Sequence, residues 1–247
     1  NTGWGYLATE GKLLFGSTQY GLTVSDSLFA IDIDTGKTVW THEARSMRNM
    51  AIAVDSGKIF LVDSRSTPEG RKKAIRERFE KFEGLSGDEL TKAEQTVAKP
   101  DVRTVVALDA AKGKKLWERP LEVSNCVRIS AGGGELIVMV KDGVLLLCGQ
   151  PWNGHFWQEF LSGKFSRRSL IALSVEDGTH KWSGKMGYRS RPLIVGKTIV
   201  AEPWAYHLQT GKPKMRENPI TGVEERWQMS RPGHHCGPIA ASAHTLA

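Results

Sequence analysis

Short apolar runs alternate with glycine-containing turns along most of the chain. Residues 28–40 read LFAIDIDTGKTVW, in which an apolar strand is followed by the turn Asp34-Thr35-Gly36 and by a second strand that ends at Trp40. Apolar residues on both strand faces are typical of a strand that is covered on both sides. A glycine can take a positive φ in a tight turn, and a tryptophan ring favours burial. The pattern therefore predicts a buried β-hairpin.

The same hairpin pattern returns along the chain. Residues 105–117 read VVALDAAKGKKLW, and residues 170–182 read LIALSVEDGTHKW. Each copy has an alanine, a turn glycine and a tryptophan at the same spacing: Ala30, Gly36 and Trp40; Ala107, Gly113 and Trp117; Ala172, Gly178 and Trp182. A fourth, degraded copy has Gly211 and places Met215 where the others have tryptophan.

A second type of hairpin precedes each copy, beginning at Tyr6, Ala51, Leu136 and Pro192. Each consists of an apolar run, a glycine turn and another apolar run, which is a hairpin signature. Two consecutive hairpins give four antiparallel strands, and a recurring unit of four strands is typical of a β-propeller blade. We therefore predict an all-β fold with blades at about residues 5–44, 49–120, 135–186 and 190–216, and a fifth blade that starts at 237–247.

The turns within the hairpins are short, and all of them fall at one end of the predicted blades. The long segments all fall at the opposite end. These long segments are residues 17–26, 65–102, 118–134, 150–168 and 216–237. Residues 68–100 form the largest insertion, and Ile75, Phe79 and Phe82 follow a helical spacing within it. Residues 86–89 read SGDE, which has the form of a capping box at the start of a second helix. We expect a helical hairpin here.

The skeleton Ala-x-Asp-x-x-Thr-Gly-Lys-x-x-Trp resembles the PQQ-type repeat of quinoprotein dehydrogenases and of the outer-membrane assembly propeller lipoprotein. The resemblance implies that Trp40, Trp117 and Trp182 stack between neighbouring blades and lock them together, with Met215 as a substitute. It also implies that residues 1–247 are part of a propeller of about seven or eight blades. A periplasmic or otherwise extracytoplasmic location is expected from the same resemblance.

Composition narrows the classes of partner. The formal net charge of +7 allows peripheral contact with an anionic surface. The sequence has no nucleic-acid-binding motif and no apolar run long enough to span a bilayer. The first residue is not methionine and the last falls inside a predicted blade, so we expect a fragment of a longer chain. Cys126 and Cys148 lie in apolar strand contexts and are expected to be buried free thiols.

Two segments of the long-loop end contain candidate binding residues. Residues 151–160 gather Trp152, His155 and Trp157, whose rings could stack on a ligand or a sugar or instead form a small core of their own. Residues 231–237 contain Arg231, His234, His235 and Cys236, of which histidine and cysteine are metal-ligand types. Adjacent residues on a strand point to opposite faces, so only His234 and Cys236 could converge on a metal. We expect a binding surface rather than a metal site.

Three functions compete. The resemblance to quinoprotein dehydrogenases implies that the chain could be part of a PQQ- and calcium-dependent dehydrogenase. The alcohol-oxidising members of that group carry an adjacent cysteine pair. This sequence has no such pair and no acidic cluster that matches the calcium ligands. A carbohydrate-acting enzyme would need a carboxylate pair, and Glu159 alone does not supply one. We therefore expect a non-catalytic binding or scaffold domain without a cofactor. Its partner would be another protein or another domain of the same polypeptide.

Overall fold

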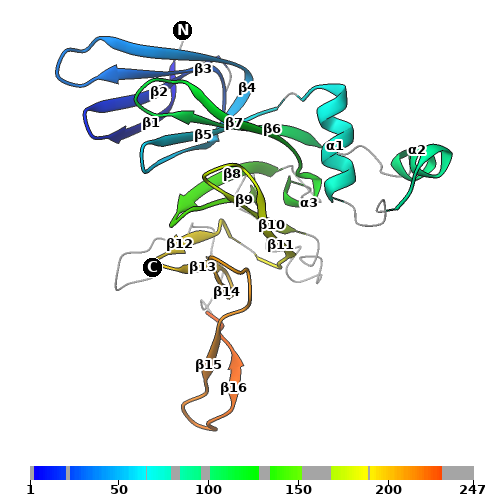
Figure 1. The fold of residues 1–247 in the computed structure, drawn as a ribbon. Coiled ribbons are helices and arrows are strands. Elements are labelled where there is room, and N and C mark those ends of the chain that lie inside the picture. Colours follow the sequence, from blue (N-terminus) through cyan, green and yellow to red (C-terminus); the bar gives the residue numbers. More distant parts are fainter. Residues whose placement is uncertain are drawn as a thin grey trace. The chain divides into compact units, whose positions relative to one another are not determined.

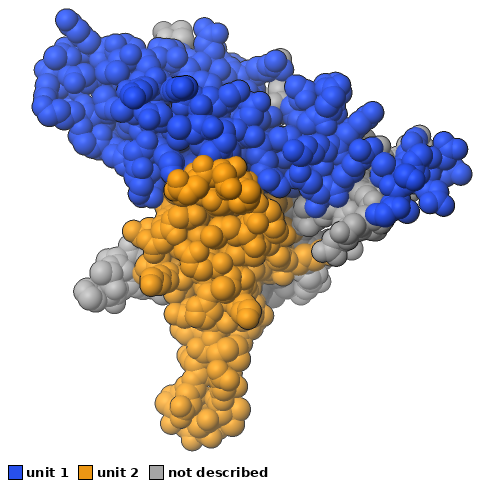
Figure 2. Space-filling view, in the orientation of Figure 1, with its two compact units in different colours: residues 1–124 blue, residues 125–247 orange. Residues whose placement is uncertain are grey.

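The computed structural model describes residues 3–20, 23–64, 66–78, 84–95, 101–127, 134–151, 168–188 and 190–229. The chain divides into two compact units, residues 1–124 and residues 125–247, which are coloured separately in Figure 2. Every pairing between the described strands is antiparallel. The all-β propeller class predicted from the repeats is confirmed, and each unit is built from consecutive antiparallel strands of these repeats.

Unit 1 contains one seven-stranded sheet in which the strands follow their chain order (Figure 1). Its strands are β1 (Gly3–Glu10), β2 (Leu13–Gln19), β3 (Val24–Asp32), β4 (Thr38–Asp55), β5 (Lys58–Asp63), β6 (Val102–Asp109) and β7 (Lys115–Glu122). Strand β4 is continuous across the boundary that the sequence analysis places between the first two blades. It pairs with β3 and then with β5, with a register shift between Met47 and Ile52. Residues 41–50 contain neither glycine nor proline, so nothing local stops the strand.

The insertion between β5 and β6 contains two helices, α1 (Pro68–Arg78) and α2 (Gly87–Gln95), both within the predicted range 68–100. Thr67 caps α1, because its Oγ1 accepts a hydrogen bond from the backbone N–H of Gly70 at 3.0 Å. The buried side chains of Ala74 and Ile75 pack with Val102 of β6, and Leu85 and Leu90 contact the same cluster. Phe79 and Phe82 lie outside the described residues. A short helix, α3 (Ser124–Val127), was not predicted.

Unit 2 contains a four-stranded sheet, a three-stranded sheet and a two-stranded hairpin. The four-stranded sheet corresponds to the third repeat and is formed by β8 (Gly134–Lys141), β9 (Val144–Pro151), β10 (Ser169–Ser174) and β11 (His180–Lys185). The remaining strands are β12 (Leu193–Val195), β13 (Thr198–Ala201), β14 (Trp204–His207), β15 (Met215–Glu217) and β16 (Glu224–Arg226). Met215 begins a strand that pairs with β16 rather than with β14, so the degraded repeat has three strands in its sheet. The predicted start of a fifth blade at 237–247 lies outside the described residues.

Buried apolar side chains form the core of each unit. In unit 1 the first repeat contributes Phe15, Leu28 and Trp40 to a cluster that also contains Val106 and Leu108 of the second repeat. Cys126 and Cys148 are buried thiols, as predicted. In the described part of the chain, no helix has the length and apolar character that crossing a membrane would require.

Candidate functional site: the tryptophan contacts between repeats

The four repeat turns have the same hydrogen bonds and the same backbone conformation. The turn glycines have positive φ values of 69° at Gly36, 66° at Gly113, 71° at Gly178 and 66° at Gly211. Each glycine N–H donates to the carbonyl four residues earlier: Asp32 at 2.8 Å, Asp109 at 2.8 Å, Ser174 at 3.0 Å and His207 at 2.8 Å. A positive φ strains any residue with a Cβ, so the repeat spacing depends on glycine at this position.

A β-bulge follows each repeat alanine. Ala30 lies directly opposite Trp40, Ala107 opposite Trp117, and Ala172 opposite Trp182, and the register shifts immediately after each alanine. All three alanines are fully buried. A bulge bends its strand and re-aims the neighbouring side chains, and alanine leaves room beside a large ring. The common spacing of the three copies therefore places each tryptophan opposite its alanine and next to a bulge.

Trp40 of the first repeat contacts the turn of the second repeat. Its indole N–H donates to the carbonyl of Ala110 at 2.9 Å, and the Trp40 side chain is largely buried. The ring lies directly against Gly113, where an added Cβ would come within 2.6 Å of Cδ2 of the indole. Phe15 flanks the other part of the ring, with ring centroids 6.0 Å apart. The first and second repeats are thus joined by one hydrogen bond and one close ring–backbone contact.

Trp182 makes the same contact in unit 2. Its indole N–H donates to the carbonyl of Leu208 at 2.9 Å. An added Cβ at Gly211 would come within 2.5 Å of Cε3 of the Trp182 ring. In both contacts the accepting carbonyl belongs to the residue three positions before the glycine. The third tryptophan, Trp117, packs against Phe60 with ring centroids 6.0 Å apart.

A buried tyrosine that the sequence analysis did not single out holds one end of the third repeat in unit 2. The hydroxyl of Tyr188 accepts a hydrogen bond from the N–H of Gly149 at 3.0 Å and donates one to its carbonyl at 2.9 Å. Nη1 of Arg168 donates to the Tyr188 carbonyl at 2.8 Å, and its guanidinium lies 5.5 Å from the ring centroid. Burial raises the pKa of the Tyr188 hydroxyl well above its usual range, so the hydroxyl remains a donor.

Tyr188→Phe is expected to lower the free energy of unfolding by about 1–3 kcal/mol, because a buried N–H and a buried carbonyl of Gly149 lose their partner. Urea denaturation followed by circular dichroism would measure the loss. Tyr20→Phe is the matched control, because Tyr20 is exposed and its hydroxyl makes one long contact of 3.4 Å to Ser46. Equal midpoints for the two variants would contradict the structural role of the Tyr188 hydroxyl.

A second aromatic arrangement lies beside the degraded repeat. The guanidinium of Arg226 sits 4.2 Å from the ring centroid of Trp204 and 5.1 Å from that of Tyr206. Its Nη2 also donates to the Tyr206 hydroxyl at 2.6 Å. This packing holds the β15–β16 hairpin against β14 within unit 2. A single arginine in a short polar strand gives no sequence signal for it.

The predicted binding residues Trp152, His155, Trp157, Arg231, His234, His235 and Cys236 all lie outside the described residues. Their grouping into one surface therefore stays a prediction. Among the described residues, no three histidine, cysteine, aspartate or glutamate side chains come together in a group that could hold a metal. The expected absence of PQQ and calcium stays a prediction as well.

A family model described as outer membrane protein assembly factor BamB, of the PQQ-like repeat type, matches residues 2–214. No curated protein matched the sequence.

Among solved structures, the chain is similar to the computationally designed Ika4 protein, with 9% identity and a TM-score of 0.43 over 93% of this chain and 92% of that one. It is similar to a europium-containing methanol dehydrogenase, with 13% identity and a TM-score of 0.39 over 89% of this chain and 36% of that one. It is also similar to BamB from Moraxella catarrhalis, with 15% identity and a TM-score of 0.32 over 85% of this chain and 62% of that one. The chain therefore spans less than two thirds of these two natural proteins.

Proposed function

The chain belongs to the PQQ-like repeat family described as outer membrane protein assembly factor BamB, and from this premise we propose that it is a non-catalytic binding domain. In this proposal the propeller repeats are a rigid scaffold within a larger protein. The bound partner is another protein or another domain of the same polypeptide. The family description also supports an extracytoplasmic location.

The proposal rests on where the short and the long connections between successive strands lie. In unit 1 the turns at Gly11, Gly36, Gly57 and Gly113 lie together at one end of the sheet, as the hydrogen bonds between them show. The N–H of Ile33 donates to the carbonyl of Lys12, the N–H of Gly57 donates to the carboxylate of Glu10, and the N–H of Ala110 donates to the carbonyl of Gly57. The long connection between β5 and β6, with helices α1 and α2, leaves the sheet at the opposite end. Loops on a rigid scaffold are where binding residues concentrate. We therefore place the binding surface at the long-loop end of the repeats.

Helix α1 gives this end a basic surface in unit 1. Ala74 and Ile75 face the sheet, whereas Lys72, Lys73 and Arg76 are exposed. Together with the net charge of +7, these side chains suit an acidic protein surface or a peripheral anionic surface. Arginine is also often one of the few residues that contribute most of the binding energy in protein interfaces.

The dehydrogenase alternative is tested by titrating the chain with PQQ and calcium while tryptophan fluorescence is followed. The expected result is no saturable change and no dye-linked alcohol oxidation, because the sequence has no adjacent cysteine pair and no acidic cluster that matches the calcium ligands. Saturable micromolar binding that requires calcium would reject the non-catalytic proposal.

The position of the binding surface is tested by chemical cross-linking and affinity capture from an extracytoplasmic extract. Two double variants are used: Trp152 and Trp157 are both replaced with alanine in the first, and His234 and Cys236 in the second. Each should reduce capture of the partner that the unmodified chain captures. Lys37→Ala is the control, because Lys37 is an exposed residue of a short turn at the opposite end. Capture that survives both double replacements and fails with Lys37→Ala would show that the opposite end binds the partner.

A further inference from the structure

A β-hairpin is inserted into the stretch of chain that runs beside β14 in unit 2. The N–H of Lys214 donates to the carbonyl of Ala205 at 2.9 Å, and the N–H of Met229 donates to the carbonyl of Pro203 at 2.8 Å. The chain therefore lies beside β14 both before and after the hairpin, whose strands are β15 and β16. Figure 1 shows this hairpin extending away from β12–β14 as a separate arm. Arg226 anchors the base of the arm through its contacts to β14.

The tip of this hairpin, residues 218–223, has the turn chemistry of the repeats. The N–H of Gly222 donates to the carbonyl of Asn218 at 2.9 Å, and the N–H of Thr221 donates to Asn218 Oδ1 at 3.2 Å. The first repeat has the same two hydrogen bonds within residues 32–36. The φ of Gly222, 66°, also matches the turn glycines of the repeats. The tip is therefore a preorganised turn, so binding there orders little additional chain.

The tip differs from the repeat turns in two side chains. Ile220 is 91% exposed and Val223 is 62% exposed. The four repeat turns have, at these two positions, aspartate and lysine, alanine and lysine, glutamate and threonine, and glutamine and lysine. The turn itself thus requires neither isoleucine nor valine. Apolar side chains that gather on an exposed projection mark a site of contact with another molecule.

Acidic side chains flank the apolar tip. Glu217 lies directly opposite Glu224 in the pairing of β15 with β16, and both residues are exposed. Like charges at opposite positions of two strands are destabilising. Glu225 pairs with Arg216 at 2.8 Å, whereas Glu217 and Glu224 have no ion-pair partner among the described residues. The partner that fits this tip therefore combines an apolar hollow with basic side chains around it.

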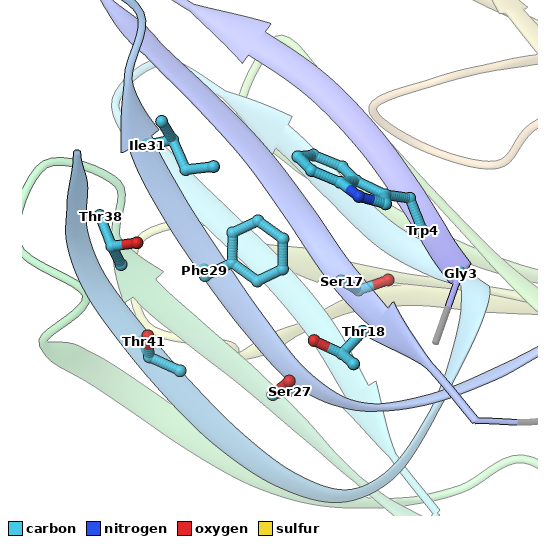
Figure 3. Close-up of a pocket in the computed structure, with 9 residues that line it drawn as sticks. All are labelled: Gly3, Trp4, Ser17, Thr18, Ser27, Phe29, Ile31, Thr38 and Thr41. Carbon is cyan, nitrogen blue, oxygen red and sulfur yellow. The ribbon is translucent and has the colours of Figure 1, made fainter. Parts of the chain in front are cut away.

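Two hollows of unit 1 differ in charge. Figure 3 shows the first, of about 410 Å³, which Trp4, Phe29 and Ile31 line together with serine and threonine hydroxyls. None of the residues that line it is charged, so it offers no cation to Glu217 and Glu224. The second hollow, of about 450 Å³, lies along helix α1 and is called the α1 groove. It is lined by Glu69, Lys72, Lys73, Arg76 and Glu77.

The α1 groove has the chemistry that the tip requires. The aliphatic stems of Lys72, Lys73 and Arg76 give it apolar walls, and these three residues are exposed. Helix α1 has five basic and two acidic residues in all. Of its two acidic residues, Glu77 already pairs with Arg119 at 2.7 Å. The groove is therefore apolar within and basic at its rim.

We propose that the hairpin tip of one copy of this chain docks in the α1 groove of a second copy. The two apolar side chains of the tip lie against the lysine and arginine stems, and Glu217 and Glu224 pair with the charged ends of Lys72 and Lys73. Charge complementarity favours a second copy as the occupant. The chain has a net charge of +7, whereas residues 215–226 carry three acidic and two basic side chains. Two copies that exchange tips would form a closed pair with two such contacts.

This inference rests on the proposed function only in treating helix α1 as a binding surface, and it names a partner for that surface. Its test uses the purified chain alone, whereas the proposed function is tested by capture with the loop variants. A chain that does not self-associate can still capture its partner. Loss of capture in the loop variants leaves self-association unchanged, so the two failures are distinguishable.

Sedimentation velocity of the purified chain measures the contact between copies. At low ionic strength, the weight-average sedimentation coefficient should rise with concentration, with a Kd on the order of 100 µM because the contact is small. Replacing both Ile220 and Val223 with serine should raise this Kd by at least about tenfold. Ile33→Ser is the matched control, because Ile33 is 51% exposed in a repeat turn, and it should change the Kd by less than about twofold. Equal effects of the tip variant and the control would overturn the proposal.

Charge exchange tests whether the α1 groove receives the tip. Lys72→Glu together with Lys73→Glu should raise the Kd at least about tenfold, because like charges then face each other. Adding Glu217→Lys and Glu224→Lys to the same chain should restore the Kd to within about threefold of the unmodified chain. Changes in the hairpin cannot repair a damaged helix, so restoration identifies direct pairing. Absence of restoration would overturn the proposal, as would a tenfold loss of affinity in Trp4→Ala, which alters the hollow of Figure 3.

Mixing two variants separates a contact between copies from a contact within one chain. The serine variant of the tip keeps its α1 groove, and the glutamate variant of the groove keeps its tip. An equimolar mixture of the two should therefore associate, although neither variant associates alone. A mixture that does not associate would overturn the proposal. Sedimentation of the unmodified chain that does not depend on its concentration would also overturn it.

Discussion

Trp40→Ala is expected to lower the free energy of unfolding of unit 1 by about 3–5 kcal/mol, the range for removing a buried aromatic ring. Trp40 is buried, with only 9% of the residue exposed. It fills the space between Phe15 and the backbone of Gly113, and neither neighbour can move easily to close the cavity. The variant also removes the donor to the Ala110 carbonyl. Urea denaturation followed by circular dichroism would measure the change in midpoint and slope.

Two controls divide this effect into its parts. Trp40→Phe keeps an aromatic ring but removes the N–H, and it should cost less than Trp40→Ala. Trp4→Ala removes an indole of the same size from the same unit, but Trp4 is 55% exposed and touches Phe29 only edge to face. Its cost should be about 1 kcal/mol or less. If Trp4→Ala destabilised unit 1 as much as Trp40→Ala, contact with the second repeat would not be the source of the stability.

The repeat hairpins could be predicted from the sequence because their chemistry is local. Asp32 shows how: its Oδ1 accepts hydrogen bonds from the N–H and the hydroxyl of Thr35, both at 2.8 Å, within a turn closed by Gly36. These hydrogen bonds, led by the one from the Thr35 hydroxyl, lower the pKa of Asp32. Aspartate, threonine and glycine at this spacing encode the turn without help from the rest of the fold.

The continuity of β4 could not be predicted in the same way. The sequence places the boundary between the first two blades just before the hairpin that begins at Ala51, whereas the strand itself depends on what pairs with each of its edges. Residues at its start pair with β3, and those at its end pair with β5. Register and pairing are set by contacts distant in sequence. The repeats therefore predict the order of the strands better than their ends.

Tyr188 illustrates what a repeat pattern misses altogether. Its partner Gly149 lies 39 residues away, and the arginine that donates to its carbonyl lies 20 residues away. A single tyrosine between a glycine and an arginine has no periodicity and no motif. The tryptophan contacts between repeats are an intermediate case. Trp40 and Gly113 could be predicted from the repeat pattern, but the carbonyl of Ala110 that accepts the indole N–H could not.

Gly113→Ala is expected to lower the free energy of unfolding of unit 1 by about 2–5 kcal/mol, from two causes that act together. The first is backbone strain, because φ at Gly113 is +66° and a Cβ disfavours this conformation. The second is overpacking, because the new methyl group would lie 2.6 Å from Cδ2 and 2.8 Å from Cε3 of the Trp40 ring. The ring cannot withdraw without losing the hydrogen bond to Ala110.

Gly36→Ala separates the two causes. Gly36 has φ of +69° and makes the same turn hydrogen bond, but its Cβ position is open among the described residues. This variant should therefore cost only the strain, about 1–2 kcal/mol. The difference between the two variants measures what the Trp40 ring requires of the residue beneath it.

A double-mutant cycle between Trp40→Ala and Gly113→Ala then isolates the contact itself. Once the Trp40 ring is removed, a methyl group at position 113 no longer overlaps it. The loss of unfolding free energy from Gly113→Ala should then fall to that of Gly36→Ala, about 1–2 kcal/mol. The sum of the two single losses of unfolding free energy should consequently exceed the loss in the double variant, with a coupling energy of about 1–3 kcal/mol. Additive losses would mean that the ring and the glycine stabilise unit 1 independently. The repeat would then need glycine for its turn alone.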